Sequence, residues 1–343
     1  MSSRGERLRV PAEAMIAVAD AGYRLALDDE TWLTGVLDAA CPLLDHGSFV
    51  HGWIIELATG TFRSGAAVRM PPGADFERHV RHQHPPPGDP DIDQGRRASA
   101  LDTATRMWAM AGPPLAERAR FPPGFGIEDC VMLGAADPSG IACALMGALP
   151  SVSRVSPRDQ ARWGRVASHL AAALRLRERL RENPEGASID SADAIVEPRT
   201  RSVSHVRGDA RDHLDAIRDA SELLAARHGT HDADKLVAAW RALVQGRWSL
   251  IDTFDTDGKR FFVLRKNPPS APGPDALNSV QRAIAGYVAM GHSNKAIAYH
   301  LGLSESATTR AVAEICRRLG VPDRERLAQL AGALGAHPEG GRA

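Results

Sequence analysis

The chain has 343 residues, of which 43% are hydrophobic and 24% charged, the balance of a globular protein with about two or three domains. Lysine plus arginine and aspartate plus glutamate each number 42, so the whole-chain positive charge that marks many nucleic-acid binders is absent. The four cysteines lie far apart without C-x-x-C spacing, which predicts reduced thiols and neither disulfides nor a zinc site. No apolar run is long enough for a signal sequence or a membrane span, so we expect a cytoplasmic protein.

The first region, residues 9–182, alternates helical and extended patterns. Residues 9–45 carry apolar side chains at helical spacing and predict two helices. Two β-hairpins follow, with turns at the Thr-Gly dipeptide 59–60 and at 137–140, where proline presets φ and glycine accepts positive φ. Between the hairpins, residues 71–98 are rich in proline and histidine and predict a loop with one short helix.

A long helix is predicted to close this region. Ser156 is its expected N-cap and Pro157 its first residue, and apolar residues then recur at three- and four-residue steps to about residue 182. This pattern fits packing on the preceding sheet, which we favour, and also fits pairing with a second copy of the chain. We interpret the arginine-rich stretch at 175–182 as a solvated helix face.

Residues 191–267 predict a smaller α/β unit with a hairpin near residue 198, two helices and a second hairpin that turns at Asp257-Gly258. A proline-rich linker at 268–276 follows. Residues 277–335 predict four short helices joined by glycine turns, with the N-caps Asn278, Ser293, Ser304 and Asp323. The whole is therefore predicted to be a multidomain chain, α/β in its first two parts and all-α in its last.

The last region has the arrangement of a helix-turn-helix, in which a tight turn presents the start of the second helix to DNA base edges. The residues that carry a further likeness are "SNKAIA" at 293–298, then Leu301, Leu303 and Ser304, and then "ICRRLGV" at 315–321. They resemble the LuxR/GerE-type helix-turn-helix family over residues 277–335. The resemblance implies a four-helix domain that reads the major groove of double-stranded DNA. We expect a homodimer, supported by the long helix and the fourth C-terminal helix.

The resemblance implies DNA contacts from Lys295, Ser304, Thr308, Thr309, Arg310, Arg317 and Arg318. Arg310 falls where family members place a base-facing side chain, and an arginine there can bind guanine through two hydrogen bonds. Thr309 stands where the family usually has a lysine. Thr308 replaces a packed valine, and its hydroxyl can fold back onto a carbonyl of the preceding turn.

The basic side chains Lys295, Arg317, Arg318 and Arg324 are expected to reach phosphates, and the helix N-terminus at Ser304 offers backbone N–H groups to another. Residues 277–335 hold seven lysines and arginines against four acidic residues, a net charge of about +3, as a nucleic-acid footprint requires.

In the order of its elements, the region 9–182 resembles a GAF-like sensor domain with an exit helix, and residues 191–267 resemble a small PAS-like unit. The combination is similar to a multidomain LuxR-type transcription regulator, which implies a small-molecule or protein signal at the N-terminal domain. The alternative is a ligand- or protein-binding interaction module whose degenerate helix-turn-helix no longer binds DNA.

Patterns of catalytic chemistry are not recognisable. The sequence has no G-x-x-x-x-G-K-[ST] loop and no nucleophile elbow. His79, His82 and His84 precede three prolines without a suitably spaced carboxylate or cysteine, and we read them as a surface loop in preference to a metal site. The tryptophans lie in apolar runs, which favours core packing over a ligand pocket. We expect no enzymatic activity, no cofactor and no metal.

Overall fold

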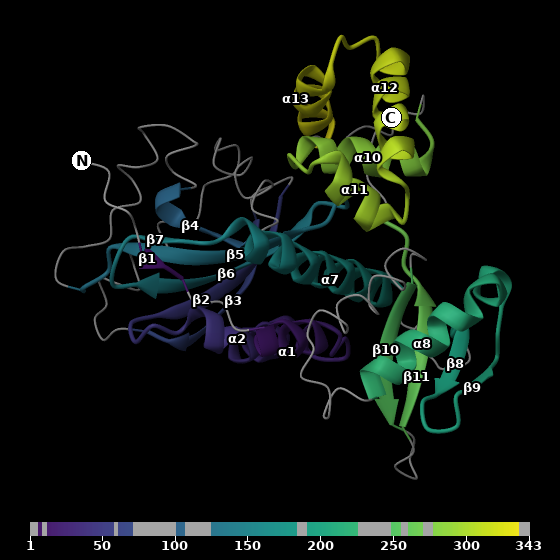
Figure 1. Ribbon diagram of the computed structural model, residues 1–343, viewed down its shortest axis with the longest axis horizontal. Coiled ribbons are helices and arrows are strands. Elements are labelled where there is room, and N and C mark those ends of the chain that lie inside the picture. The colour runs from purple at the N-terminus through teal and green to yellow at the C-terminus, as the bar shows by residue number, and fades with distance from the viewer. Residues whose placement is uncertain are drawn as a thin grey trace.

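The computed structural model describes residues 6–8, 12–57, 61–70, 101–106, 125–183, 191–225, 248–254, 260–269 and 277–335. These parts of the chain contain two antiparallel sheets with their own helices, one short parallel strand pair and a C-terminal group of helices (Figure 1). Several expectations lie outside the described residues: the turn at 59–60, the short helix and the histidines within 71–98, the helix predicted near 232–246, the turn at 257–258, and most of the linker predicted at 268–276.

The first sheet has five strands in the order β3-β2-β6-β5-β4, and every neighbouring pair is antiparallel. Its strands are β2 (Val50–Glu56), β3 (Thr61–Arg69), β4 (Leu101–Thr103), β5 (Asp129–Ala136) and β6 (Ile141–Leu149). Two short strands, β1 (Glu6–Arg7) and β7 (Ser153–Arg154), pair separately and in parallel. Both predicted hairpins are confirmed as β2–β3 and β5–β6, and the turn of the second has Gly140 at φ +102° as expected.

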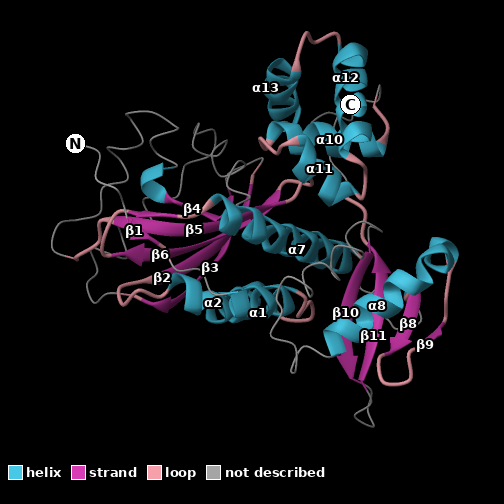
Figure 2. Cartoon of the chain, viewed as in Figure 1, coloured by secondary structure: helices cyan, strands magenta, loops and turns pink. Residues whose placement is uncertain are grey.

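Three helices, α1 (Ala12–Gly22), α2 (Asp29–Leu44) and α7 (Pro157–Glu182), pack on one face of this sheet (Figure 2). The Ser156 hydroxyl accepts the N–H of Asp159, so the predicted cap of the long helix is confirmed. Trp163 and Leu170 of α7 are completely buried among residues of the sheet and of α1 and α2. The long helix therefore packs on its own sheet, and the same face is not available to a second copy.

The expectation that residues 175–182 form a solvated helix face is wrong for the first turn of this stretch. Arg175 and Arg177 are both buried, at 6% and 3% exposure. The Arg177 guanidinium donates to Asp29 at 2.9 Å and lies 5.0 Å from the centre of the Trp32 ring. Arg175 pairs with Asp137 and Arg177 pairs with Asp29, and both partners are far away in the sequence. This pairing offsets the cost of burying the two arginines.

The second sheet has four antiparallel strands in the order β10-β11-β8-β9. The strands are β8 (Ala194–Glu197), β9 (Ser202–Ser204), β10 (Trp248–Phe254) and β11 (Arg260–Lys266), and they are accompanied by a 3-10 helix η3 (Gly208–His213) and the helix α8 (Leu214–Ala225). Trp248 and Phe262 are buried in the small core that this sheet shares with Ala19 of α1. The antiparallel pairs β8–β9 and β10–β11 confirm both hairpins predicted for residues 191–267.

The C-terminal helices are α10 (Ser279–Ala289), α11 (Asn294–Leu301), α12 (Glu305–Leu319) and α13 (Arg324–Gly335). Side chains of the four predicted residues cap them. Their core extends into the first sheet, because Ile55, Leu57, Ala136 and Ala142 are buried in the same apolar cluster as Tyr287 and Leu301. Among the described helices, none has the length and apolar character needed to cross a membrane.

Gly147 in β6 gives a test of this packing. A Cβ at this position would collide with the carbonyl oxygen of Leu44 in α2 and would lie 2.7 Å from its carbonyl carbon. We expect Gly147→Ala to lower the free energy of unfolding by about 1–3 kcal/mol, because backbone must move. In urea unfolding, the control Gly164→Ala in α7, where nothing lies within 4 Å of the added Cβ, should gain roughly 0.5–1 kcal/mol. Equal effects of the two substitutions would contradict the close approach of α2 to β6.

Candidate nucleic-acid interface

A tight turn joins α11 to α12. Gly302 ends α11 in the left-handed conformation, at φ 65°, and the Leu303 N–H donates to the Ala298 carbonyl at 2.9 Å. This is the Schellman pattern, in which glycine avoids the steric cost that a side chain would add. The Ser304 hydroxyl then accepts the Ala307 N–H at 3.1 Å and starts α12. The turn therefore needs only three residues, which is the geometry of a helix-turn-helix.

Helix α12 has one buried face and one exposed face. Thr308, Val312, Ile315 and Cys316 are buried, at the spacing of a helical stripe. Ser306, Arg310, Ala313 and Arg317 are exposed, and their four- and three-residue steps place them on one side of the helix. Arg310 thus points away from the domain in the first two turns of the helix, and it forms no ion pair within the described parts of the chain.

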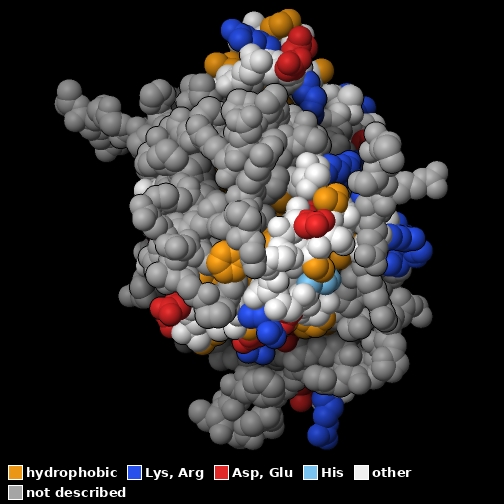
Figure 3. Space-filling view, turned by 90° about the vertical axis from the view of Figure 1, so that its left-hand side faces the viewer, with side chains coloured by type: hydrophobic (Ala, Val, Ile, Leu, Met, Phe, Trp, Pro, Cys, Tyr) orange, Lys and Arg blue, Asp and Glu red, His pale blue; other side chains and the backbone are white. Residues whose placement is uncertain are grey.

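Lys295 lies in the first turn of α11, and its side chain is also exposed. Both helices of the motif thus present one cation near their N-terminal ends. The tip of the domain carries cations and acids side by side, as Figure 3 shows at the top of the molecule. The surface is therefore mixed in charge, and its cations must be considered one by one.

Arg317 and Arg318 share one acidic partner. The Arg317 Nε and the Arg318 Nε each donate to Glu314 at 2.8 Å. These two hydrogen bonds lower the pKa of Glu314 to about 2, so the carboxylate stays ionised and competes with any phosphate for both guanidinium groups. Arg317 and Arg318 are placed at the surface as predicted, with part of their charge neutralised.

The hydroxyls of Thr308 and Thr309 both form hydrogen bonds within the domain. Thr308 is 0% exposed and its hydroxyl donates to the Ser304 carbonyl at 3.1 Å, so the expected fold-back is confirmed. Thr309 is exposed, but its hydroxyl donates to the Glu305 carbonyl at 3.0 Å and accepts from Asn294 at 2.9 Å. The Thr309 hydroxyl ties α12 to α11.

Arg324 was expected to reach a phosphate, but its side chain forms hydrogen bonds within the domain. Its guanidinium donates to Asn294 Oδ1 at 2.7 Å and to the His292 carbonyl, so it joins the start of α13 to the start of α11. Asn294 is thereby held between Arg324 and Thr309. Asn294 belongs to the "SNKAIA" motif, but no role was expected for it, because its partners Thr309 and Arg324 are 15 and 30 residues away in the sequence.

The base of these helices holds two buried histidines. His300 stacks on Tyr287 with 4.4 Å between ring centres, and His292 meets both rings edge-on. The Ser168 hydroxyl of α7 donates to the Gly164 carbonyl at 2.8 Å, which leaves its oxygen to accept a hydrogen from His300 Nε2 at 3.2 Å. This polar contact joins the end of α11 to the long helix.

Four capped helices, a three-residue turn and an exposed start of the third helix together define a helix-turn-helix domain. Residues 275–331 match the family described as bacterial regulatory proteins, luxR family. This part of the chain is a LuxR-family helix-turn-helix domain, a type of domain found in DNA-binding transcription regulators and without catalytic function. No curated protein sequence matches the chain.

Groups of three or more histidine, cysteine or carboxylate side chains able to hold a metal do not occur among the described residues. His292, His300 and His169 of α7 are all buried, at 8%, 8% and 2% exposure. Burial lowers the pKa of His292 to about 4 and that of His169 to about 3, and it lowers the pKa of His300 as well. The three imidazoles are therefore neutral in the folded chain at neutral pH.

These histidines predict acid sensitivity between pH 6.5 and 5. In the unfolded chain a histidine takes up its proton near pH 6.5, whereas the folded chain does not, so stability falls as the pH drops by up to about 1.4 kcal/mol per pH unit for each group. Urea unfolding at several pH values should show this slope, and His292→Gln should reduce it. The control His46→Gln, at an exposed site, should retain the full slope. An unchanged slope in His292→Gln would contradict the burial of a neutral imidazole.

Proposed function

We propose that the chain is a transcription regulator whose C-terminal domain binds double-stranded DNA by placing the first turns of α12 in the major groove. The observation that carries this proposal is the exposed Arg310 on the outer face of a capped helix that follows the tight turn. Arg310 supplies the base contact, because its guanidinium can bind guanine O6 and N7 together. Lys295 and the N-terminus of α12 at Ser304 bind phosphates.

Arg317 and Arg318 complete the phosphate contacts once they exchange Glu314 for DNA. Thr309 contributes through its position at the helix surface, and Thr308 is not part of the proposed interface because its side chain is buried. The domain binds as a homodimer, for which α13 is the supporting helix, since α7 is covered by its own sheet. The activity needs no enzymatic step and no cofactor.

Residues 9–182 form, in this proposal, a GAF-like sensor domain, residues 191–267 a PAS-like unit and residues 277–335 the DNA reader. Support for a sensor comes from the second face of the first sheet, which α1, α2 and α7 do not cover. Met146 and Cys130 are buried there in an apolar cluster, with Trp53, Met70 and Met132 packed against it. Thioether side chains adapt to varied apolar partners.

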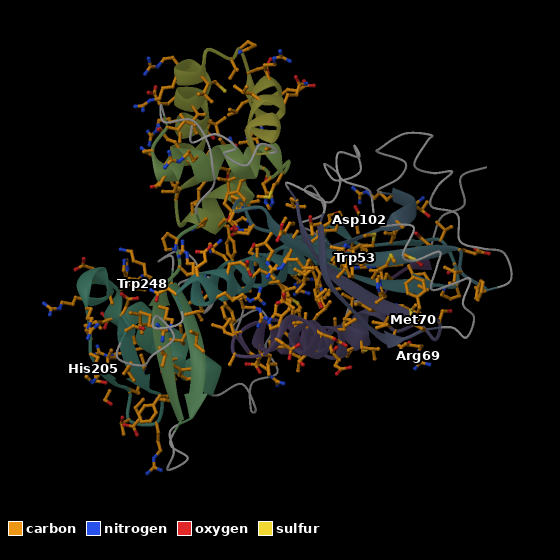
Figure 4. The ribbon with its side chains drawn as sticks, turned by 180° about the vertical axis from the view of Figure 1, so that it is seen from behind. Trp53, Arg69, Met70, Asp102, His205 and Trp248 are labelled. Atoms are coloured by element: carbon orange, nitrogen blue, oxygen red, sulfur yellow. The ribbon has the colours of Figure 1, made fainter. Side chains whose placement is uncertain are left out.

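Asp102 pairs with Met132 across β4 and β5 and so lies on this second face, where burial raises the pKa of its carboxyl group. Figure 4 shows Trp53, Met70 and Asp102 together in this half of the molecule, away from His205 and Trp248. We propose this face as the place where a small-molecule or protein signal acts. A thermal-shift screen of small molecules on the wild-type chain and on Met132→Gln tests it, and hits that survive the substitution place the signal elsewhere.

Arg310 provides the direct test of DNA reading. We expect Arg310→Ala to weaken binding to a cognate promoter fragment by about 1–3 kcal/mol, roughly tenfold or more, and to relax base preference at one position. Thr308→Val, which alters a buried position on the same helix, should leave the affinity unchanged. Gel-shift titration at several salt concentrations measures both.

The rival proposal, an interaction module with a degenerate helix-turn-helix, is favoured by the pairing of Arg317 and Arg318 with Glu314 and by Thr309 in the place of a lysine. It expects Arg310→Ala to change nothing. Absence of salt-dependent binding to any promoter fragment at low salt would refute DNA reading and leave this rival.

Glu314 gives a second test, because it competes for two of the proposed phosphate contacts. Glu314→Gln should strengthen DNA binding and steepen the fall of affinity with salt, since each additional phosphate neutralised adds about one to the slope. Glu325→Gln removes the same charge from an exposed site on α13 and serves as the matched control. Equal gains in the two variants would show that net charge alone acts and that Arg317 and Arg318 do not reach DNA.

A further inference from the structure

The long helix α7 carries a polar face that is buried between the three parts of the molecule. Ser168, His169 and Arg175 lie on this face, and each is at most 6% exposed. The Tyr23 hydroxyl approaches His169 Nδ1 at 3.4 Å, and Ser168 contacts His300 as described above. Figure 1 shows α7 running from the first sheet towards both the helix-turn-helix domain and the second sheet. Polar groups are costly in such a place unless each has a partner.

Arg175 lies at the centre of this face and binds groups from both sheets. Its Nη1 donates to Asp137 Oδ2 in the β5–β6 turn. Its Nε donates to Asn267 Oδ1, and its Nη2 donates to the Asn267 carbonyl, both at 3.0 Å. The guanidinium is a rigid fork with five N–H groups, which is why one side chain can hold three acceptors in fixed directions.

Both partners of Arg175 are themselves fixed. Asp137 Oδ1 accepts the Ser139 N–H at 3.0 Å, so the same carboxylate shapes the β5–β6 turn. The amide of Asn267, at the end of β11, donates to the Ala172 carbonyl of α7 at 2.8 Å and to Ser249 of β10 at 2.9 Å. Arg175 therefore joins the turn of the first sheet to the exit of the second sheet.

The turn that Arg175 holds lies against the helix-turn-helix domain. Ala136 and Ala142, which flank the Asp137 turn, are buried in the same apolar cluster as Tyr287 of α10. Its ring stacks on His300, which in turn contacts Ser168, two helical turns before Arg175 on α7. The docked domain thus contacts α7 through the Ser168–His300 hydrogen bond, and it contacts the first sheet through apolar residues that include Ala136, Ile55 and Leu57.

We propose that Arg175 is a positioning residue that holds the helix-turn-helix domain in one orientation against both sheets and transmits displacement of the β5–β6 turn to it. The consequence for DNA reading rests on the function proposed above. A buried ion pair is either complete or strongly unfavourable, so the junction has discrete states and no continuum of intermediates. Because the outer face of α12 stays exposed in the docked state, this contact sets the direction of the reader and does not block it.

The test is a distance measurement between spin labels in the full chain. Labels at Ala161→Cys on α7 and Gln329→Cys on α13 report the orientation of the domain, and labels at Ala313→Cys and Gln329→Cys report its internal structure. The half-buried Cys41 is first replaced by serine, and the other three cysteines are buried. The labelled chain is mixed with an excess of unlabelled chain, so that a homodimer carries only one labelled copy. In the otherwise unchanged chain we then expect one narrow distance for each pair.

The decisive variant combines Arg175→Met with Asp137→Asn. It removes both buried charges together, and the amide oxygen at position 137 can still accept the Ser139 N–H, so the fold should survive. We expect loss of the single narrow distance between α7 and α13 with no change within the domain. The matched control, Arg201→Met with Glu222→Gln, removes an exposed ion pair and should change neither distance.

Arg175→Lys supplies a second variant that decides the question if the double variant does not fold. It keeps the charge for Asp137 but cannot hold both oxygens of Asn267, so we expect the distance between the helices to broaden. A narrow distance in every folded variant would overturn the proposal. The distances are measured without DNA, so they can be compared with a separate measurement of promoter binding by the chain without these substitutions. If the Arg175 variants lose the narrow distance and the unsubstituted chain binds no promoter, the role of Arg175 is supported and DNA reading is refuted. If the unsubstituted chain binds a promoter and the variants keep the narrow distance, DNA reading is supported and the role of Arg175 is refuted.

Discussion

Burial of the Arg175 guanidinium is the constraint around which the described parts of the chain are assembled. Its side chain is 7% exposed and that of its partner Asp137 is 0% exposed, so both ions have lost almost all of their water. Such a loss costs several kcal/mol for each ion and is offset only by close pairing and further hydrogen bonds. The two oxygens of Asn267 supply those bonds, and thereby the turn of the first sheet, the exit of the second sheet and the long helix must meet at one point.

This meeting point determines which surface of the helix-turn-helix domain remains for a partner. Helices α10 and α11 pack against the first sheet through Tyr287 and its apolar neighbours, and His300 of α11 contacts Ser168 of α7. The outer face of α12 and the start of α11 lie on the remaining surface, with Arg310 and Lys295 exposed. A domain that shares its core with the rest of the chain cannot turn freely. The direction in which Arg310 points is therefore a property of the whole chain.

Features encoded by local sequence could be predicted, and those that depend on distant partners could not. The caps at Ser156, Asn278 and Ser304 need only residues within one helical turn, and all three were predicted correctly. The arginines at 175 and 177 were misread as solvated, because their acidic partners Asp137 and Asp29 are far away in the sequence. Periodicity reports which positions face inward but assigns a charged residue to solvent by default.

The residues of the candidate interface also fall into two groups, those whose placement could be predicted from local sequence and those whose placement could not. The exposure of Arg310 and the fold-back of Thr308 follow from helical spacing and from the chemistry of a hydroxyl in a helix, and both agree with the sequence-based expectation. The role of Arg324 could not be predicted, because an arginine at the start of α13 gives no sign that it will bind the carbonyl of His292, which lies in the turn between α10 and α11. Cations counted from sequence alone therefore overstate the charge that is available to phosphates.

At Thr309 the domain has a hydrogen-bonding side chain in place of a cation. Where family members usually carry a lysine, this chain has a hydroxyl that accepts from Asn294, and Asn294 is held by Arg324. The exchange gives up a cation and ties α11, α12 and α13 into one network. In the DNA-binding function that we propose, a single domain with fewer cations has little electrostatic affinity, and two domains on adjacent half-sites would have to add their contributions. Such addition is effective only when both readers are held at the right spacing and angle, since linked sites lose their advantage when geometry forbids simultaneous contact. If the domain reads DNA as we propose, its weak charge makes a fixed orientation, and the proposed role of Arg175 in holding it, more important for binding.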